Sequence, residues 1–477
     1  MPAAPLPPLP TLRSALTFLF ALLLAGCATL QPDAGFDAVR NVGREHLGQD
    51  LAWPRSAAER EAIERSVADI VGSASPLDAD AVVRVALLNN RALQAAYAEL
   101  AVADADRVSA SRLPNPGFSF ARLRRGDEVE IERSLHLDLA RLVALPWAAD
   151  AAARQQQVVQ RETAAQALAL AHDTRRAWAQ AVAAEEGVRY ARQVMEAADA
   201  SAELARRMAQ VGNFNALQRA REQGFYADAA MNVARAEQRR LAARERLTRL
   251  MGLWGEQTAY TLPERLPDLP REPRELPAAE QLAMAQRLDV QAARAAVQQT
   301  AANLGLTRTT RFVNVLELGL QRNSSNEAPT QRGYEISVEL PLFDFGQARV
   351  AKAEAIYLRE LNRAAATAVQ ARSEVREAYG TYRHAWDIAR HHRDEIVPLS
   401  KRIADENLLR YNGMLIGVFE LLADARSQIA AVNSSIEALR DFWIADADLR
   451  QALVGRAGIA PLAAGTPAPS AEPSGAH

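Results

Sequence analysis

The chain has 477 residues and a net charge of −2, with 56 basic against 58 acidic side chains, so no strong positive field marks it as a nucleic-acid binder. Hydrophobic residues make up 49% of the chain, but aromatic residues only 6%. The apolar content is mostly alanine, the best helix former, which also lets helices pack closely. This composition predicts long, closely packed helices. A single cysteine excludes a disulfide framework and a cysteine metal cage.

The amino terminus has the features of an export signal. The apolar stretch 14–26 is too short to span a bilayer as a helix and has the length of a signal-peptide core. The following residues, Leu-Ala-Gly-Cys at 24–27, resemble the lipobox of bacterial lipoproteins, which implies cleavage before Cys27 and a covalent lipid on its thiol. Ala28 comes next rather than aspartate, which in such lipoproteins implies sorting to the outer membrane. An ordinary signal peptide with an incidental cysteine is the alternative.

The remaining chain repeats itself after about 200 residues. Segments 212–223 and 417–428 both read G-x-F-x-x-L-x-x-A-R-x-Q and lie 205 residues apart. Two further matches keep the same order at offsets of 197 and 203: 93–96 with 290–293, and 250–252 with 453–455. A common order at nearly constant offsets indicates one duplicated unit.

Each repeat is expected to begin with a helix of some thirty residues, at 77–111 and at 278–309. A pair of strands follows, at 116–123 with 129–137 and at 312–321 with 334–340. Apolar residues recur there at every second position, as in strands with one apolar and one polar face: Phe118, Phe120, Val129, Ile131, Leu316, Leu318, Leu320, Ile336 and Val338. A soluble hairpin covering a helix shows the same alternation. No later apolar run has the length of a membrane helix, so a chain that crosses a membrane here would need a closed β-barrel.

A very long helix should follow each strand pair. The first is expected over 147–211, and its counterpart over 347–411, where Pro398 predicts a kink or break. After a glycine-containing turn, a return helix of roughly forty residues should run to Gly252 or Gly455, each suited to a left-handed C-terminal cap.

The predicted organisation has six parts. They are a lipoprotein signal peptide (1–26), a lipid-anchored N-terminal segment (27–75) with a short helix over 57–72, the first repeat (76–255), a proline-rich linker (256–275), the second repeat (276–455) and a disordered tail (456–477).

No catalytic motif is present in the sequence: there is no phosphate-binding glycine loop, no nucleophile elbow and no zinc-protease motif. His384 and His391 lie seven apart on the second long helix and could share a face. A metal relay is conceivable there, but a solvated or interhelical polar position is the preferred interpretation. We therefore predict no enzyme, no metal site and no cofactor apart from the lipid on Cys27.

These features together resemble the TolC-like outer-membrane efflux channels. The resemblance covers about residues 76–455 and is most specific at 411–422, with Leu-Pro-Leu-Phe-Asp-Phe-Gly at 340–346 similar to the family's strand-to-helix turn. It implies a mainly α fold with a small β part. Three chains would give a trimeric α-barrel and a 12-stranded transmembrane β-barrel, four strands from each chain. The first repeat departs from the family pattern at 136–140, and Asn215 stands where an acidic residue is usual.

The resemblance implies a passive exit duct for small molecules or ions across the periplasm and outer membrane. The homotrimer would work with a periplasmic adaptor and an inner-membrane pump, and its cargo stays open. Alternatives are a lipid-anchored periplasmic adaptor, which carries one hairpin and more β-structure, and a coiled-coil scaffold, which needs sustained heptads. Nucleic acid is not an expected partner.

The two turns are the expected periplasmic tip, marked by Gly212, Phe214, Gly417 and Phe419. Glu420 and Asp424 lie four apart, so they share one face of the return helix. Threefold symmetry would place six carboxylates around a constriction that favours cations and binds a divalent ion. The alternative is that both acids face water and only favour the helix dipole. The matched positions in the first repeat, 215 and 219, add no acid.

Overall fold

The computed structural model describes residues 29–311, 315–339 and 343–456. The signal peptide, Cys27 and the tail beyond residue 456 lie outside the described residues, as do the first residues of the third expected strand and part of the turn at 340–346. Within the described ranges, no helix is long and apolar enough to cross a bilayer.

The chain divides into two compact units, each of which takes segments from both halves of the sequence. Unit 1 contains residues up to Trp53, Gln94–Ala164 and Gln286–Ser373. Unit 2 contains Pro54–Leu93, Ala165–Ala285 and the chain from Glu374 onward. The two sequence repeats are therefore interleaved in both units.

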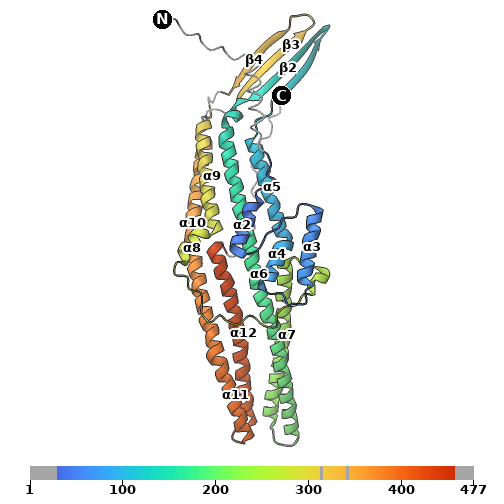
Figure 1. The fold of residues 1–477 in the computed structure, drawn as a ribbon, viewed down its shortest axis with the longest axis vertical. Coiled ribbons are helices and arrows are strands. Elements are labelled where there is room, and N and C mark those ends of the chain that lie inside the picture. Colours follow the sequence, from blue (N-terminus) through green and yellow to red (C-terminus); the bar gives the residue numbers. More distant parts are fainter. Residues whose placement is uncertain (1–28, 312–314, 340–342, 457–477) are drawn as a thin grey trace, which may run out of the picture. The chain divides into compact units, whose positions relative to one another are not determined.

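Unit 1 carries the four-stranded antiparallel sheet, in the order β1-β2-β3-β4 (Figure 1). Its strands are β1 (Gly117–Arg125), β2 (Glu128–Asp138), β3 (Leu316–Ser325) and β4 (Gln331–Val338). The second pair is longer at the hairpin end than the sequence predicts, so only 326–330 remain as the connecting loop. Because β2 pairs with β3, one hairpin from each repeat joins in a single sheet.

The helix that opens each repeat is broken, so the prediction of one continuous helix is wrong in both repeats. The first half contains α4 (Ala79–Asn89) and α5 (Arg91–Ser111), the second α8 (Ala279–Gln286) and α9 (Leu288–Thr310). Asn90 and Arg287 interrupt them with extended ψ angles of 116° and 121°. Asn90 donates from its side chain to the carbonyl of Leu250, and Arg287 is fully buried against Asp289. Such tertiary contacts override helix propensity.

The long helix α6 (Leu139–Gln210) starts eight residues earlier than expected and contains Pro146. Asp138 caps its start, because Oδ1 of this residue accepts the amide of Arg141 at 2.8 Å. The proline has no amide to donate to the carbonyl four residues back, at Leu142. The missing hydrogen bond did not end the helix, so the start predicted at residue 147 was wrong.

The second long helix is interrupted immediately before Pro398, as predicted. The helix α10 (Gln347–His391) passes through a π-helical turn, His392–Ile396, into α11 (Val397–Asn412). A wider turn next to proline accommodates the missing amide donor.

The return helices are α7 (Ala216–Met251) and α12 (Val418–Val454). Gly252 caps α7 in the left-handed conformation (φ 67°), and a Cβ there would meet the Asn89 carbonyl at 2.9 Å. Gly455 is extended instead (φ −175°), so the left-handed cap predicted for it is wrong. Its amide still donates to Gln451, four residues back, at 2.8 Å. The helical bonding of α12 therefore runs to the glycine without a reversed turn.

The amino-terminal region adds two helices, α2 (Phe36–Leu47) and α3 (Ala57–Val71); the second was predicted. Phe36 packs edge-on against Tyr97 of α5 within unit 1. In unit 2, α8, α10 and α12 share a core around Tyr382, Trp386 and Phe442. The proline-rich linker packs on this core, because the indole of Trp386 donates to the Pro270 carbonyl at 3.0 Å.

Candidate functional site

The four-stranded sheet has one apolar and one polar face. Phe118, Leu135, Leu320 and Tyr334 are paired across the four strands and therefore point to the same side. Strand alternation adds to this side all of the apolar residues that the sequence pattern singled out. The predicted alternation is confirmed. Several of these side chains are well exposed, Tyr334 by 75% and Phe118 by 66%.

The opposite face of the sheet is acidic. Alternation places six carboxylates there: Glu128, Glu130, Glu132, Asp138, Glu317 and Glu335. Arg125 is the only Lys or Arg of the four strands on that side. Most of the other positions on that side hold serine, glycine, glutamine or asparagine, as in the cross-strand pair Ser119–Ser134, and the exceptions are Ala121, Leu123 and His136. This face can be hydrated and attracts cations.

The turn between α6 and α7 is closed by backbone hydrogen bonds. The amide of Gly212, at φ 80°, donates to the carbonyl of Ala209 at 3.2 Å. The next amide, of Asn213, donates to Met208 at 2.9 Å. Phe214 is buried beneath the turn.

The turn between α11 and α12 repeats this pattern with different residues. Met414 is the left-handed position (φ 59°), and its amide donates to Tyr411 at 2.9 Å. Leu415 donates to Arg410 at 2.9 Å. The side chain of Phe419 is not described.

The two turns therefore match at an offset of 202 residues, and the sequence match at 205 is wrong by three. Gly212 corresponds to Met414, whereas Gly417 corresponds to Asn215 and precedes its helix in extended conformation (φ −80°). Asn215 caps α7, since its Oδ1 accepts the amide of Gln218 at 2.8 Å. The position that corresponds to Glu420 is consequently Gln218, not Asn215.

The offset of 202 residues aligns an acid of the first repeat that the match at 205 leaves out. Asp424 corresponds to Glu222 of α7, so the first repeat does contribute a carboxylate. Glu420 is exposed, Asp424 is half-buried and accepts a hydrogen bond from Asn407, and Glu222 is only 2% exposed.

Glu222 of α7 links the α6–α7 hairpin to the α11–α12 hairpin within unit 2. Nη2 of Arg426, on α12, donates to both carboxylate oxygens at 3.0 and 2.9 Å. The hydroxyl of Ser201 on α6 donates at 2.8 Å, and the guanidinium lies 4.3 Å above the ring of Phe225. A buried carboxylate is costly unless it is paired and hydrogen-bonded, as it is here.

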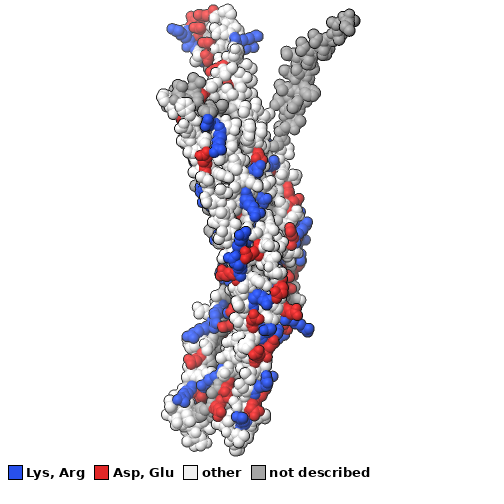
Figure 2. Space-filling model, turned by 90° about the vertical axis from the view of Figure 1, so that its left-hand side faces the viewer, with Lys and Arg blue, Asp and Glu red and all other residues white. Residues whose placement is uncertain are grey.

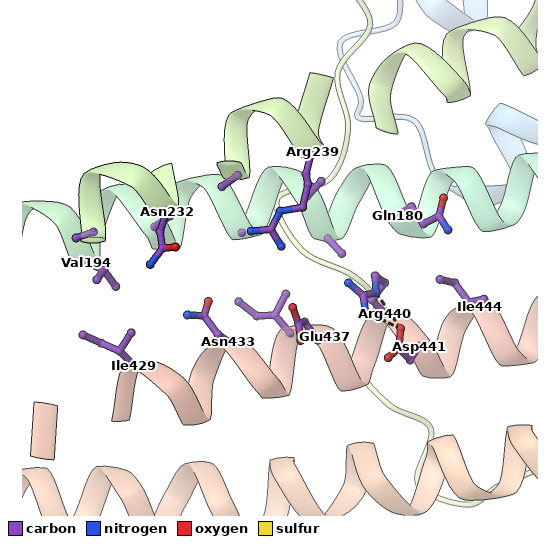
Figure 3. Close-up of a pocket in the computed structure, with 17 residues that line it drawn as sticks. Gln180, Val194, Asn232, Arg239, Ile429, Asn433, Glu437, Arg440, Asp441 and Ile444 are labelled. Atoms are coloured by element: carbon purple, nitrogen blue, oxygen red, sulfur yellow. Dashed lines mark hydrogen bonds and ion pairs between the residues drawn. The ribbon is translucent and has the colours of Figure 1, made fainter. Parts of the chain in front are cut away.

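A groove of about 600 Å³ lies between the α6/α7 hairpin and α12 (Figure 3). Small residues line it on α6, among them Ala183, Gly187 and Ala191, opposite isoleucines of α12. Arg440 and Asp441 pair at one side of it at 2.8 Å. Small side chains on a long helix leave room for another helix to approach.

A buried histidine links α6 directly to α12. His172 Nε2 lies 2.7 Å from Asp448 Oδ1, and Nδ1 lies 3.2 Å from Asp173 Oδ1. Burial lowers the pKa of His172, but the hydrogen bonds to Asp173 and Asp448 outweigh it, and the net pKa is raised. The protonated imidazolium of His172 therefore links α6 to α12 more strongly than the neutral imidazole does.

The His384/His391 pair shows no metal geometry. Both side chains are exposed, and His391 Nδ1 lies 3.3 Å from Glu395. Among the described residues, no cluster of three or more potential ligands could hold a metal ion.

Basic and acidic side chains are interspersed along the helices on the face shown in Figure 2, without a large field of one sign. This agrees with the balanced composition.

The comparisons with known proteins identify the fold. No family model matches the sequence, and no curated protein does. Solved structures do match. A membrane protein from Pseudomonas aeruginosa is 20% identical over 81% of this chain and 95% of its own, with a TM-score of 0.68. For the Campylobacter jejuni outer membrane channel CmeC, the identity is 16%, the coverage 87% and 91%, and the TM-score 0.67.

The Neisseria gonorrhoeae outer membrane channel MtrE, solved in its open state, is 20% identical over 78% of this chain and 88% of its own, with a TM-score of 0.65. The predicted fold class, mainly helical with a small β part, is confirmed by the structure and shared with these channels. The chain has the fold of the outer-membrane channels, the TolC-like fold that its sequence resembles.

Proposed function

We propose that this protein is the outer-membrane channel of a tripartite efflux system, a passive exit duct. The observation that carries the proposal is the two-faced sheet on this fold: an apolar face that suits lipid and an acidic face that suits a water-filled lumen. A periplasmic adaptor or a coiled-coil scaffold would have no use for an exposed apolar sheet face.

The assembly is a homotrimer in this proposal. Strands β1 and β4 are the edges of the sheet, each with one paired side. An open edge in lipid leaves backbone donors and acceptors unsatisfied, so edges must meet those of other copies. Three copies of four strands give the 12-stranded barrel that the resemblance implies.

The cargo is cationic or neutral in this proposal. Six carboxylates and one arginine per chain face the lumen. Rings of acidic side chains favour cations in a pore. An inner-membrane pump and a periplasmic adaptor would supply energy and substrate selection, with the adaptor meeting the turns at Gly212 and Gly417.

The constriction proposed at Glu420 and Asp424 rests on fewer free charges than expected. Asp424 is engaged by Asn407, and its counterpart Glu222 is neutralised by Arg426. The exposed Glu420 is therefore the main contributor in this proposal.

Lipidation of Cys27 anchors the chain in this proposal. The described chain begins at Thr29, whose carbonyl accepts from Arg107 of α5 at 3.2 Å, and Gln31 donates to the buried Asp104 at 2.8 Å. These two hydrogen bonds hold the start of the described chain against α5. A radioactive fatty acid should label the wild type but not Cys27→Ala; equal labelling of both would refute lipidation.

The channel proposal predicts that the two faces of β4 tolerate a charge differently. Ile336→Arg places a charge on the apolar face, and Ser337→Arg places the same charge one residue along, on the polar face. The first should cost about 2–4 kcal/mol in lipid and lower the yield of heat-resistant trimers. The second should be tolerated. Equal recovery of both variants, or no trimer in the wild type, would contradict the proposal.

A further inference from the structure

Arginines interrupt the apolar face of the sheet, midway along β2 and toward the hairpin-loop ends of β3 and β4. The register pairs Arg133 of β2 with Arg322 of β3, and Arg322 with Arg332 of β4. Three guanidiniums thus form one row across three strands, which we call the arginine row. Strand alternation puts Arg122 and Arg124 on the same side, nearer the β1–β2 turn.

The charges of the sheet are segregated between its two faces. All six carboxylates of the strands lie on the polar face, and none lies on the face of the arginine row. Basic and acidic side chains both gather at this end of the sheet, at the top of Figure 2. In the described part of the chain, no acidic side chain forms an ion pair with any member of the arginine row.

The guanidinium groups of the arginine row repel one another. Side chains that are directly opposite on neighbouring strands have Cβ atoms about 4.5–5.5 Å apart, and like charges in such pairs are destabilising. Two consecutive pairs of this kind, with no acid beside them, are unfavourable in the isolated chain. An anion that bridges the guanidiniums would remove this repulsion.

The neighbouring residues define what kind of anion fits. Toward the helices, the same face continues as Leu320, Leu318 and Leu316, with Tyr334 and Ile336 on the next strand. A ligand on this surface must therefore combine an anionic group with hydrocarbon. Guanidinium groups bind phosphate bidentately and are the preferred phosphate ligands at such sites.

We propose that the arginine row binds the phosphate groups of a phosphorylated glycolipid in the outer leaflet, with the acyl chains of that lipid lying along the apolar band below. This inference rests on the proposed function, because it requires the apolar face to meet lipid. In this proposal the arginine row lies at the level of the lipid headgroups, where a charge on the lipid face costs only about 0–1 kcal/mol.

The test uses the purified full-length trimer in detergent and two probes, bisphosphorylated lipid A and the same lipid with its phosphates removed. Native mass spectrometry counts lipid molecules per trimer. We expect the wild type to retain the phosphorylated lipid at least tenfold better than the dephosphorylated one. The triple variant Arg133→Gln, Arg322→Gln, Arg332→Gln should lose that preference.

The control carries the same charge change on exposed arginines of α3 and α4, Arg60→Gln, Arg65→Gln and Arg84→Gln, and should bind like the wild type. Equal binding by the arginine-row variant, or an equal loss in the control, would overturn the inference. Displacement of the lipid by millimolar inorganic phosphate would also overturn it, because the row would then be a site for free anions.

Channel activity of the same preparations separates this inference from the proposed function. Single-channel conductance in planar bilayers should be present in the wild type and in the triple variant. Conductance without phosphate-dependent lipid binding would refute the lipid site alone. Lipid binding without conductance would refute the duct alone.

Discussion

The α6–α7 turn and the α11–α12 turn have the same backbone and different side chains. Both place one residue in the left-handed region, Gly212 in the first and Met414 in the second. The cap that follows is a hydrogen-bonded asparagine in the first turn, whereas in the second it is Gly417, which has no side chain to offer. Duplication thus preserved the path of the chain at the two helix reversals while the residues that stabilise each one diverged.

A second difference concerns the acid on the return helix. Glu222 is buried and holds Arg426 of the other hairpin, whereas its counterpart Asp424 is half-buried and accepts from Asn407 within its own hairpin. The first repeat therefore provides a link between hairpins, and the second provides a link within one.

The largest expected effect follows from breaking the link between the hairpins. Arg426→Gln leaves the Glu222 carboxylate buried without its charged partner, which should cost about 3 kcal/mol of stability. The matched control is Arg410→Gln. It removes an exposed ion pair in which Nε of Arg410 lies 3.6 Å from Glu406, and this loss should cost under about 0.5 kcal/mol. Thermal unfolding of the two variants in the same detergent compares them, and equal losses would show that Glu222 does not depend on Arg426.

The left-handed positions should respond in opposite directions. Gly212→Ala adds a Cβ at φ 80° and should cost about 1 kcal/mol. Met414→Gly removes a Cβ at φ 59° and should stabilise by up to about 1 kcal/mol. Urea midpoints of the two variants test this, and a loss of stability in both would mean that the turns are not equivalent.

The contact between His172 of α6 and Asp448 of α12 should make stability depend on pH. His172 faces Asp173 on its own helix and Asp448 on α12, and Arg176 lies 3.5 Å from the same Asp448. Because the pKa of His172 is raised on folding, its contribution is complete below the unfolded value of about 6.5. It is lost as the pH rises through the folded-state pKa. The thermal midpoint of the wild type should fall over that range, and that of Asp448→Asn should fall less; identical profiles would refute this assignment.

The smallest expected effect is at the exposed acid of the second turn. Glu420→Gln should lower cation preference and relieve block by divalent ions more than Asp424→Asn does, because Asp424 is already engaged by Asn407. Single-channel recordings with added Mg²⁺ compare the two. Unchanged block in both variants would mean that these acids only face water at a helix start.

The sheet was predictable from the sequence to a degree that the turns were not. A period of two assigns Phe118, Leu318 and Ile336 to one side, and antiparallel pairing keeps that parity across strands. The sequence match between the two turns was displaced by three residues. Three residues are nearly one helical turn, so a shift of three preserves the spacing of leucine and alanine along a helix. The match at 205 residues therefore looked regular although the backbone matches at 202.

The Glu222–Arg426 pair could not be predicted, because its members are 204 residues apart and on different repeats. Its only signal was an acid at the position that corresponds to Asp424, which becomes visible once the register is corrected. The helix breaks at Asn90 and Arg287 lie 197 residues apart, the same offset as the 93–96 match. That offset located equivalent positions, but only tertiary contacts explain why the helices break there.

The ion selectivity of the open channel shows directly which face of the sheet lines the duct. Because the acidic face lines the duct in this proposal, the wild type in a planar bilayer under a KCl gradient should show a reversal potential on the cation-selective side. Neutralising three carboxylates of that face, in Glu130→Gln, Glu132→Gln and Glu335→Gln, should move the reversal potential toward zero. The same change at three exposed helix positions, Glu45, Glu61 and Glu99, should leave it in place. Unchanged selectivity in the sheet variant, or no conductance in the wild type, would contradict a duct lined by the acidic face.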